Sequence, residues 1–363
     1  MRKTLVTLLF VTIVTALTAA QQFQPAAYYR ATGSGGYVGG SVAADFNHDG
    51  WADLAVIDTN ANTGFVFMNQ KNGTFGQGLL FRLPSATIGI AAGDLNTDNK
   101  IDLVTISTYD GAPGVLQIFL GNADGTFTQG NHYLVGSAPT RVVVADLNGD
   151  GHNDVAVVNW QGGGVMIFLG DGHGNLTAAG RYRGARNPLA MAVGDVNGDG
   201  HPDIVVAGIT GTLGVLLNQG DGTFINGSSA AISTSPLDLT LVDLNRDGKL
   251  DVVVSQNPMN VLLNNGDGTF GAATSYASDS DPRGLTTADF NHDGNPDIAL
   301  ITLNSGIDLY YGNGDGTLQA AINIGLQAQA DNSGAVADFD KDGAPDLAVN
   351  TGESRVAVLL NSQ

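Results

Sequence analysis

The sequence contains no cysteine and a single glutamate. It has 363 residues and 35 acidic side chains, all of them aspartate except Glu353. The absence of cysteine excludes disulfides and thiol nucleophiles. A pair of catalytic glutamates is excluded as well, although two aspartates would still serve such a mechanism. Gly-x-Ser-x-Gly, His-Glu-x-x-His and P-loop patterns are also missing. The sequence therefore favours a protein that is not an enzyme.

Positive charge is scarce. Fifteen lysines and arginines stand against 35 acidic residues, so the formal net charge is −20. A chain this negative is repelled by phosphate backbones, and we expect no nucleic-acid partner.

Long apolar runs are equally rare, and the only one lies near the N-terminus, from Leu5 to Leu17. It follows Arg2 and Lys3 and precedes Thr18-Ala19-Ala20, which is typical of a secretory signal peptide over residues 1–20. The alternative is a single membrane anchor, for which the run is short. We expect a secreted or cell-surface protein with no membrane span after cleavage.

One nine-residue acidic pattern is abundant. From Asp195 to Asp203, oxygen-bearing side chains occupy positions 1, 3, 5 and 9, and a glycine occupies position 6. Ca²⁺ takes several oxygen ligands at once, and glycine lets the backbone turn sharply around the ion. Residues 204–207 are apolar and mostly β-branched, which predicts a buried strand in place of the helix of an EF-hand. The pattern thus predicts a calcium loop that joins two strands.

The pattern occurs seven times, at 45–53, 94–102, 146–154, 195–203, 243–251, 289–297 and 338–346, and its starts are 49, 52, 49, 48, 46 and 49 residues apart. A fixed period of this size, with room for four short strands, is typical of propeller blades. We predict up to seven Ca²⁺, held by the side chains at positions 1, 3, 5 and 9 and by the backbone carbonyl at position 7. The predicted ligands are Asp45, Asn47, Asp49, Trp51, Asp53, Asp94, Asn96, Asp98, Lys100, Asp102, Asp146, Asn148, Asp150, His152, Asp154, Asp195, Asn197, Asp199, His201, Asp203, Asp243, Asn245, Asp247, Lys249, Asp251, Asp289, Asn291, Asp293, Asn295, Asp297, Asp338, Asp340, Asp342, Ala344 and Asp346.

A glycine-rich turn runs in phase with the loops. It reads Asp-Gly-Thr-Phe or a close variant at 72–75, 124–127, 174–176, 221–224, 267–270 and 315–318. The last repeat stops before its turn and fourth strand, while residues 22–26 look like an unpaired fourth strand. We therefore predict one all-β domain over residues 21–363. It is a seven-bladed β-propeller of four-stranded antiparallel blades, in which the N-terminal strand completes the C-terminal blade and removes an open sheet edge.

These Asp-x-Asn-x-Asp-Gly-x-x-Asp loops, each followed by a short apolar strand, resemble FG-GAP and VCBS-type repeats, including those of integrin α-subunit propellers. The resemblance extends over residues 23–361. It implies a secreted or surface-exposed propeller with Ca²⁺ at one end of each blade, serving cell adhesion or binding proteins or glycans. Two loops depart from the pattern: Asn99 replaces the glycine of the second, and Asp340 replaces the asparagine of the last. Because asparagine tolerates positive φ, we expect the second site to be weakened and retained.

Three functions remain open: a binding or adhesion module for a protein partner, which is our working hypothesis, a lectin-like module for polysaccharide, and a carbohydrate-active enzyme. In a four-stranded blade the acidic loops and glycine-rich turns share one face. Arginine and aromatic side chains, which recur at binding hot spots, map to the other. We predict that a monomer binds its protein or glycan ligand on the face opposite the acidic loops. The residues concerned are Arg30, Arg82, Arg141, Arg181, Arg183, Arg186, Arg283, Arg355, Tyr37, Tyr109 and Trp160.

Overall fold

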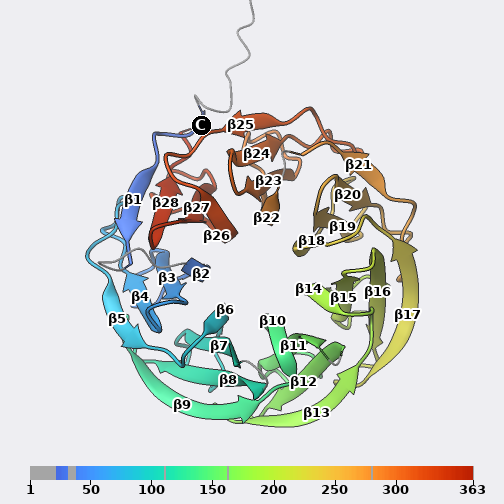
Figure 1. Ribbon diagram of the computed structural model, residues 1–363, viewed down its shortest axis with the longest axis horizontal. Helices are drawn as coiled ribbons and strands as arrows, with labels where there is room; N and C mark the ends of the chain where they lie inside the picture. The colour runs from blue at the N-terminus through green and yellow to red at the C-terminus, as the bar shows by residue number, and fades with distance from the viewer. Residues whose placement is uncertain (1–21, 32–37, 110–111, 162, 279–280, 363) are drawn as a thin grey trace, which may run out of the picture.

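The computed structural model describes residues 22–31, 38–109, 112–161, 163–278 and 281–362. The expected signal peptide lies outside these residues. The strands form seven four-stranded antiparallel sheets, arranged as blades around a common axis (Figure 1). The predicted seven-bladed propeller is confirmed. Among the described residues, no helix is both long and apolar enough to cross a bilayer.

Blades one to six follow the chain, and each runs from its innermost to its outermost strand. Blade one contains β2 (Val38–Ala44), β3 (Asp53–Asp58), β4 (Thr63–Phe67) and β5 (Leu79–Arg82). Blade two contains β6 (Thr87–Gly93), β7 (Asp102–Tyr109), β8 (Ala112–Gly121) and β9 (Phe127–Leu134). Blade three contains β10 (Ser137–Ala145), β11 (Asp154–Gln161), β12 (Gly164–Gly170) and β13 (Leu176–Tyr182). Blade four contains β14 (Pro188–Gly194), β15 (Asp203–Gly208), β16 (Thr212–Asn218) and β17 (Phe224–Ala231). Blade five contains β18 (Asp238–Val242), β19 (Asp251–Ser255), β20 (Met259–Leu262) and β21 (Thr274–Tyr276). Blade six contains β22 (Pro282–Ala288), β23 (Asp297–Thr302), β24 (Gly306–Tyr310) and β25 (Ile322–Ile324).

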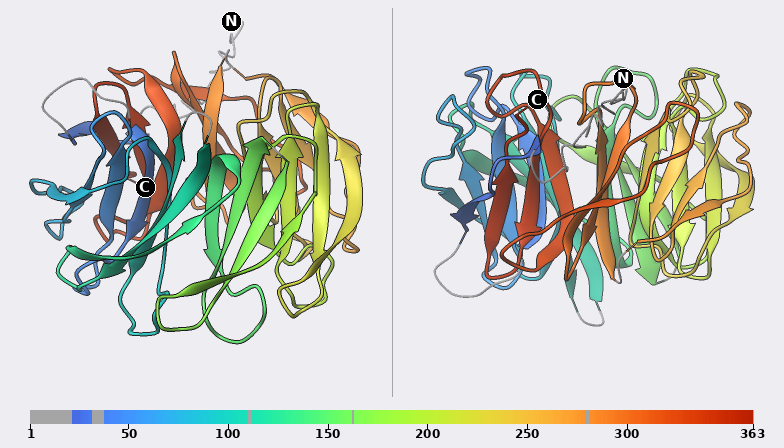
Figure 2. Two further views of the ribbon diagram at one scale, coloured as in Figure 1. Left: turned by 60° about the horizontal axis from the view of Figure 1, so that its bottom comes forward. Right: turned by 90° about the horizontal axis from the view of Figure 1, so that it is seen from above.

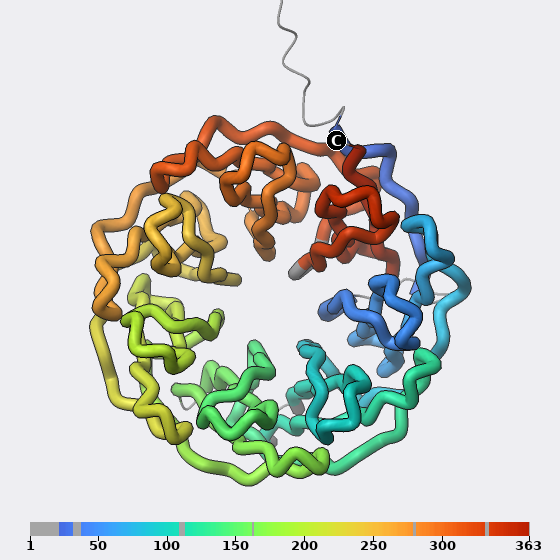
Figure 3. The backbone as a smooth tube through the Cα atoms, turned by 180° about the vertical axis from the view of Figure 1, so that it is seen from behind, coloured from blue at the N-terminus to red at the C-terminus, as the bar shows by residue number. Residues whose placement is uncertain are grey.

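The seventh blade is built from both ends of the chain. It contains β26 (Ala330–Ala337), β27 (Asp346–Thr351), β28 (Arg355–Leu359) and, outermost, β1 (Ala27–Arg30). β1 runs antiparallel to β28. In Figure 3 the blue N-terminal segment lies beside the red last blade. The predicted closure is confirmed. The predicted strand boundaries, 22–26, are wrong, because only Phe23 pairs there, in a single bridge to Asn361, and Pro25 has no N–H to donate.

The apolar core lies between blades and not at the axis. Seven clusters of buried side chains each combine residues of two neighbouring blades; in one, Val104 and Ile118 of blade two pack with Val155 and Phe168 of blade three. The second strands are buried on both faces, as in β15, and this explains their continuously apolar sequences. Each blade is therefore stabilised mainly by its two neighbours.

The innermost strands need small residues because they converge on the axis. A Cβ atom at Gly93 of β6 would lie 2.7 Å from Cγ1 of Val144 in β10, so glycine is required for this close approach. Seen from the side, connections emerge at both ends of the blades (Figure 2). We call the end with the seven acidic loops and the glycine-rich turns the acidic-loop face. The other end, with the remaining connections, is the opposite face.

Candidate metal centres

All seven acidic loops join the first strand of a blade to its second strand, so they share one face. The glycine-rich turns lie beside them, each against the loop of the preceding blade. The backbone N–H of Gly125 donates to the carbonyl of Phe46 at 3.2 Å, and that of Gly268 donates to Val196 at 3.1 Å. The arrangement on one face that the sequence predicts is therefore confirmed.

The first half of each loop is shaped by its own acidic side chains. In the first loop, the carboxylate of Asp45 accepts the N–H groups of Asp49 at 3.0 Å and of Gly50 at 2.7 Å. Asn47 accepts a second bond from the N–H of Asp49, and Asp49 accepts the N–H of Trp51. Such bonds from side chain to nearby backbone curl the chain and turn the oxygens of positions 1, 3 and 5 toward its inside.

Position 6 of the loops requires a left-handed backbone. Gly50 has φ of 84°, and the other glycines at this position are similar. Asn99 of the second loop adopts φ of 61°, and its N–H donates to Asp94 at 2.8 Å, as the glycine N–H does elsewhere. The substitution therefore leaves the conformation of the second loop intact.

The aspartate at position 9 of each loop is buried and joins two backbone segments through hydrogen bonds, and we call it a staple. Asp203 has no exposed surface, and its two carboxylate oxygens accept different backbone N–H groups, that of Val196 at 3.1 Å and that of Asn218 at 2.8 Å. The first donor is position 2 of the same loop and the second ends the third strand. The same pair of bonds occurs at Asp53, Asp102, Asp154, Asp251, Asp297 and Asp346. The sequence predicts these residues only as metal ligands, so their role as staples is a new finding.

The position 9 carboxyls are costly to ionise without a cation. Burial raises the pKa of Asp53 to about 6 and the pKa of Asp297 and Asp346 to about 7, although the backbone donors act in the opposite direction. Negative charges at positions 1 and 5 of the first loop raise the pKa of Asp53 further. A divalent cation among these groups would stabilise their charged forms.

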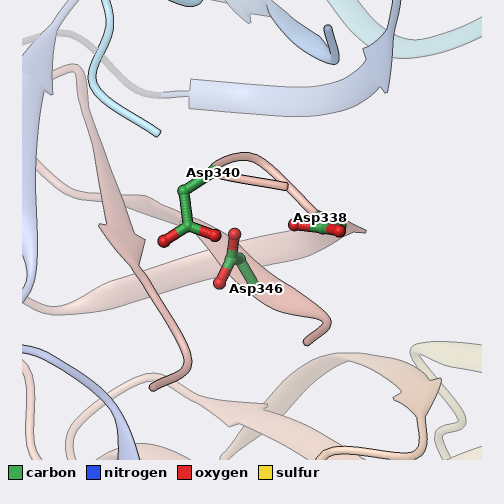
Figure 4. Close-up of side chains that lie close together, drawn as sticks. All are labelled: Asp338, Asp340 and Asp346. Carbon is green, nitrogen blue, oxygen red and sulfur yellow. The ribbon is translucent and has the colours of Figure 1, made fainter. Parts of the chain in front are cut away.

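The last loop brings three carboxylates together. Oxygen atoms of Asp338, Asp340 and Asp346 all lie within 4.8 Å of one another, and among the described residues this is the only such group of three potential acidic, histidine or cysteine ligands (Figure 4). Oδ1 of Asp338 is buried and has no hydrogen-bond partner among the residues that the structure describes. Burial and then the charges of Asp342 and Asp338 raise the pKa of Asp340. Because Ca²⁺–oxygen bonds are about 2.3–2.6 Å long, oxygens of one coordination sphere lie up to roughly 5 Å apart, and the group fits such an ion.

Positions 4 and 7 connect neighbouring loops. Nζ of Lys341, at position 4 of the last loop, lies 4.5 Å from the ring centroid of Trp51, at position 7 of the first. Nη1 of Arg246 likewise donates to Oδ1 of Asn295 at 3.2 Å across blades five and six. The sequence predicts only a backbone carbonyl ligand at position 7. These contacts join different repeats, so no single repeat reveals them.

An asparagine at the end of the third strand makes a second connection between blades. Nδ2 of Asn218 donates to the carbonyl of Leu147, position 2 of the preceding blade's loop, at 2.7 Å. Asn69, Asn264 and Asn361 make the equivalent bond. Sequence reasoning missed these residues, although in three repeats they stand three positions before the glycine-rich turn and could have been found by aligning the repeats.

On the opposite face, only some of the predicted arginines are available to bind a ligand, because others already form ion pairs. Arg283 pairs with Asp281 and Arg355 with Glu353, at 3.1 and 2.7 Å, while Arg141 lies near the axis beside Asp238. Arg183 and Arg186 are exposed. Tyr37 lies outside the described residues. Trp160 is half-buried, with an indole N–H that is shielded and unpartnered within the described part of the chain.

The FG-GAP-like repeat matches this sequence six times, at residues 45–105, 94–157, 146–206, 195–254, 243–300 and 289–349. The chain belongs to the FG-GAP-like repeat family. Each match starts with one acidic loop and ends in the second strand of the next blade. All seven acidic loops and their apolar strands are therefore FG-GAP-like elements. None of the curated proteins matches this FG-GAP-like chain.

Solved structures share the fold at low sequence identity. Crystal structures of BBS1N in complex with ARL6DN, one soaked with lead and one with mercury, both superpose with a TM-score of 0.68. They are 12% and 13% identical to this FG-GAP-like chain, cover 94% of it, and are themselves covered to 98% and 97%. A functionally unknown protein from Desulfotomaculum acetoxidans DSM 771 has a TM-score of 0.57 and 13% identity, with 81% of this chain and 85% of that one covered.

Proposed function

We propose that this protein is an exported, calcium-stabilised propeller that binds a protein partner on its opposite face. The single observation that best supports the metal is the group formed by Asp338, Asp340 and Asp346. Its carboxylates lie close enough to share one ion, and one of their oxygens is buried with no hydrogen-bond partner in the described part of the chain. A carboxylate oxygen that is shielded from water and receives no hydrogen bond is costly, and a divalent cation would remove that cost.

The ligands proposed for each ion are the side chains at positions 1, 3, 5 and 9 and the carbonyl at position 7. In the other six loops position 3 is asparagine, which supplies a neutral oxygen where the last loop has Asp340. Bound Ca²⁺ would offset the repulsion between carboxylates and tie the first and second strands of a blade together. Calcium loops in extracellular modules bind with dissociation constants of about 10⁻⁴–10⁻³ M, which suits an exported protein.

Three observations support a protein partner. The related BBS1N propeller was crystallised as a complex with ARL6DN. The connections of the opposite face are short, but their sequences differ from blade to blade, and binding residues are common on connections that join rigid strands. It also carries the exposed Arg183 and Arg186, a side-chain type enriched at the centres of protein interfaces.

Capture experiments with the mature chain, residues 21–363, test this function. The immobilised protein is incubated with an extract of its native surroundings in 1 mM CaCl₂ or in EGTA, and bound proteins are identified and then purified. We expect a protein that binds in pure form, directly and only with Ca²⁺. If purified proteins fail to bind while an immobilised polysaccharide is retained, the partner class is wrong and the lectin-like function takes its place.

A further inference from the structure

The opposite face has a cleft between blades three and four. The two blades are neighbours in the ring (Figure 1). Its volume is about 690 Å³, more than twice the roughly 290 Å³ of the cavity at the axis. We call it the blade-3/4 cleft and define it by the residues that line it, namely Gly163, Thr212, Ser229 and the connection 183–187 between β13 and β14. Clefts of about 300–1,000 Å³ are the size that encloses a ligand or a few residues of a peptide.

The charge around the blade-3/4 cleft is opposite to that of the whole molecule. Residues 155–237 contain three basic residues, Arg181, Arg183 and Arg186, and all three lie in β13 or the connection after it. The acidic residues of the same stretch all lie in acidic loops or glycine-rich turns, on the other face: Asp171, Asp195, Asp199, Asp203 and Asp221. A protein with a net charge of −20 thus has a local surface, at this cleft, without a single acidic residue from the two blades that form it.

The two arginines of the cleft have no acidic partner in the part of the chain that the structure describes. Among the described residues, no carboxylate lies within ion-pair distance of Arg183 or Arg186, whereas Arg283 and Arg355 of the same face both have one. Guanidinium groups bind carboxylates through two parallel hydrogen bonds. Arg183 and Arg186 therefore present unused donors to whatever enters the cleft.

The backbone that carries these arginines is fixed in place. A Cβ atom at Gly184 would lie 2.3 Å from Cγ2 of Val206, so the connection packs directly on blade four. At its end, the carbonyl of Asn187 accepts the N–H of Ile209 at 3.2 Å, and Nδ2 of Asn187 reaches the carbonyl of Trp160 in blade three at 3.4 Å. Both arginines thus project from a preorganised base, which lowers the entropy lost on binding.

We propose that the blade-3/4 cleft binds an acidic peptide segment of the partner protein. Arg183 and Arg186 pair with its carboxylates, and the hydroxyls of Thr212 and Ser229 bond to its main chain. The described residues of the lining include no aromatic ring on which a sugar could pack, which favours a peptide over an acidic polysaccharide. This inference rests on the proposed function in taking the partner to be a protein, and it adds the place and the chemistry of recognition.

The probe for this site is fluorescein-labelled hexaglutamate, with labelled hexaglutamine as the neutral control. Fluorescence anisotropy is recorded with the mature protein in 1 mM CaCl₂ at low ionic strength. We expect binding of hexaglutamate alone, weakened by added salt because exposed charges are screened. The double variant Arg183→Ala/Arg186→Ala should bind about fivefold to tenfold more weakly, as expected for two solvent-accessible charge pairs.

The matched control is Arg246→Ala, because Arg246 is an exposed arginine on the acidic-loop face, at position 4 of the fifth loop, and it belongs to no predicted ligand-binding or metal-binding set. It should bind like the unchanged protein. Equal binding of hexaglutamate by the double variant and the unchanged protein overturns the proposal. The proposal is also overturned if the unchanged protein binds polygalacturonate and does not bind hexaglutamate. Failure here is separable from failure of the proposed function. If a partner is captured with Ca²⁺ and binds the double variant as tightly as the unchanged protein, only the proposal for the cleft is refuted. If the capture experiments find no partner protein, the proposed function itself is refuted.

Discussion

Arg141 of blade three forms an ion pair with Asp238 of blade five. Nε of the arginine lies 3.3 Å from Oδ1 of the aspartate, and its Nη2 donates to the carbonyl of Leu237 at 2.9 Å. The two blades are not neighbours, since β14 of blade four lies between them in the ring (Figure 1). The pair is well shielded, with 25% and 14% of the side chains exposed. It therefore connects blades three and five directly, past the inner strand of blade four.

Replacing Arg141 should destabilise the propeller. Arg141→Ala leaves the shielded Asp238 without its counter-charge. We expect the free energy of unfolding to fall by about 1–3 kcal/mol, between the values for exposed and fully buried pairs. Chemical denaturation measures the change, and Arg355→Ala, which removes a more exposed pair with Glu353, is the control and should cost under about 1 kcal/mol. A double-mutant cycle with Asp238→Ala isolates the pair, and additive effects would show that the two residues do not interact.

Removing calcium should lower the melting temperature. With a dissociation constant of about 10⁻⁴ M, 1 mM Ca²⁺ stabilises the folded state by about 1.4 kcal/mol at each site. Metal analysis of the protein after dialysis against Ca²⁺ should find several ions per chain, and calorimetry with and without EGTA should show the shift. Mg²⁺ is the control cation, because it dehydrates reluctantly and suits these loops less well. Fewer than about four ions per chain would count against calcium binding by all the loops.

Two aspartates of one loop should differ in how much their replacement lowers the stability of the protein without Ca²⁺. Asp199, at position 5, is exposed and accepts the backbone N–H of His201, whereas Asp203, at position 9, is buried and accepts two backbone N–H groups. Asp199→Ala should remove one Ca²⁺ and leave stability in EGTA nearly unchanged. Asp203→Ala should remove the same ion and also lower stability in EGTA by about 2–6 kcal/mol, because two buried donors lose their partner. Equal stabilities of the two variants in EGTA would contradict the staple role.

The sequence was sufficient to predict the elements that repeat. Loop, apolar strand and turn lie close together in each period, so their pattern shows the blade, and seven periods show the ring. Contacts between repeats could not be predicted. Lys341 meets Trp51 only because the last blade lies beside the first, and Arg141 meets Asp238 only because the inner strands converge at the axis. The closing strand was predicted five residues too early, since its start depends on which residues after Pro25 face β28.

The last prediction concerns that closing strand. The N-terminal segment, residues 22–31, connects three blades. Phe23 packs edge-on against Phe290 of blade six with ring centroids 5.9 Å apart, and β1 pairs with β28 of blade seven. Tyr29 of β1 packs against Phe75 of blade one with ring centroids 5.3 Å apart. Deleting residues 21–30 removes all three contacts and leaves the outer edge of β28 open to other chains. We expect a lower melting temperature and concentration-dependent association, measured by calorimetry and by light scattering after size-exclusion chromatography.

Tyr29→Ala is the matched control for this deletion, because it removes only the ring contacts of Tyr29 with Phe67 and Phe75 and keeps the strand. It should lower the melting temperature by less than the deletion does and leave the protein monomeric. A synthetic peptide of residues 21–31, added in excess, should pair with the open edge of the truncated protein and reverse its association, since an exposed strand edge accepts an extended peptide. A truncated protein that stays monomeric with an unchanged melting temperature would show that β1 occupies the seventh blade without stabilising the ring.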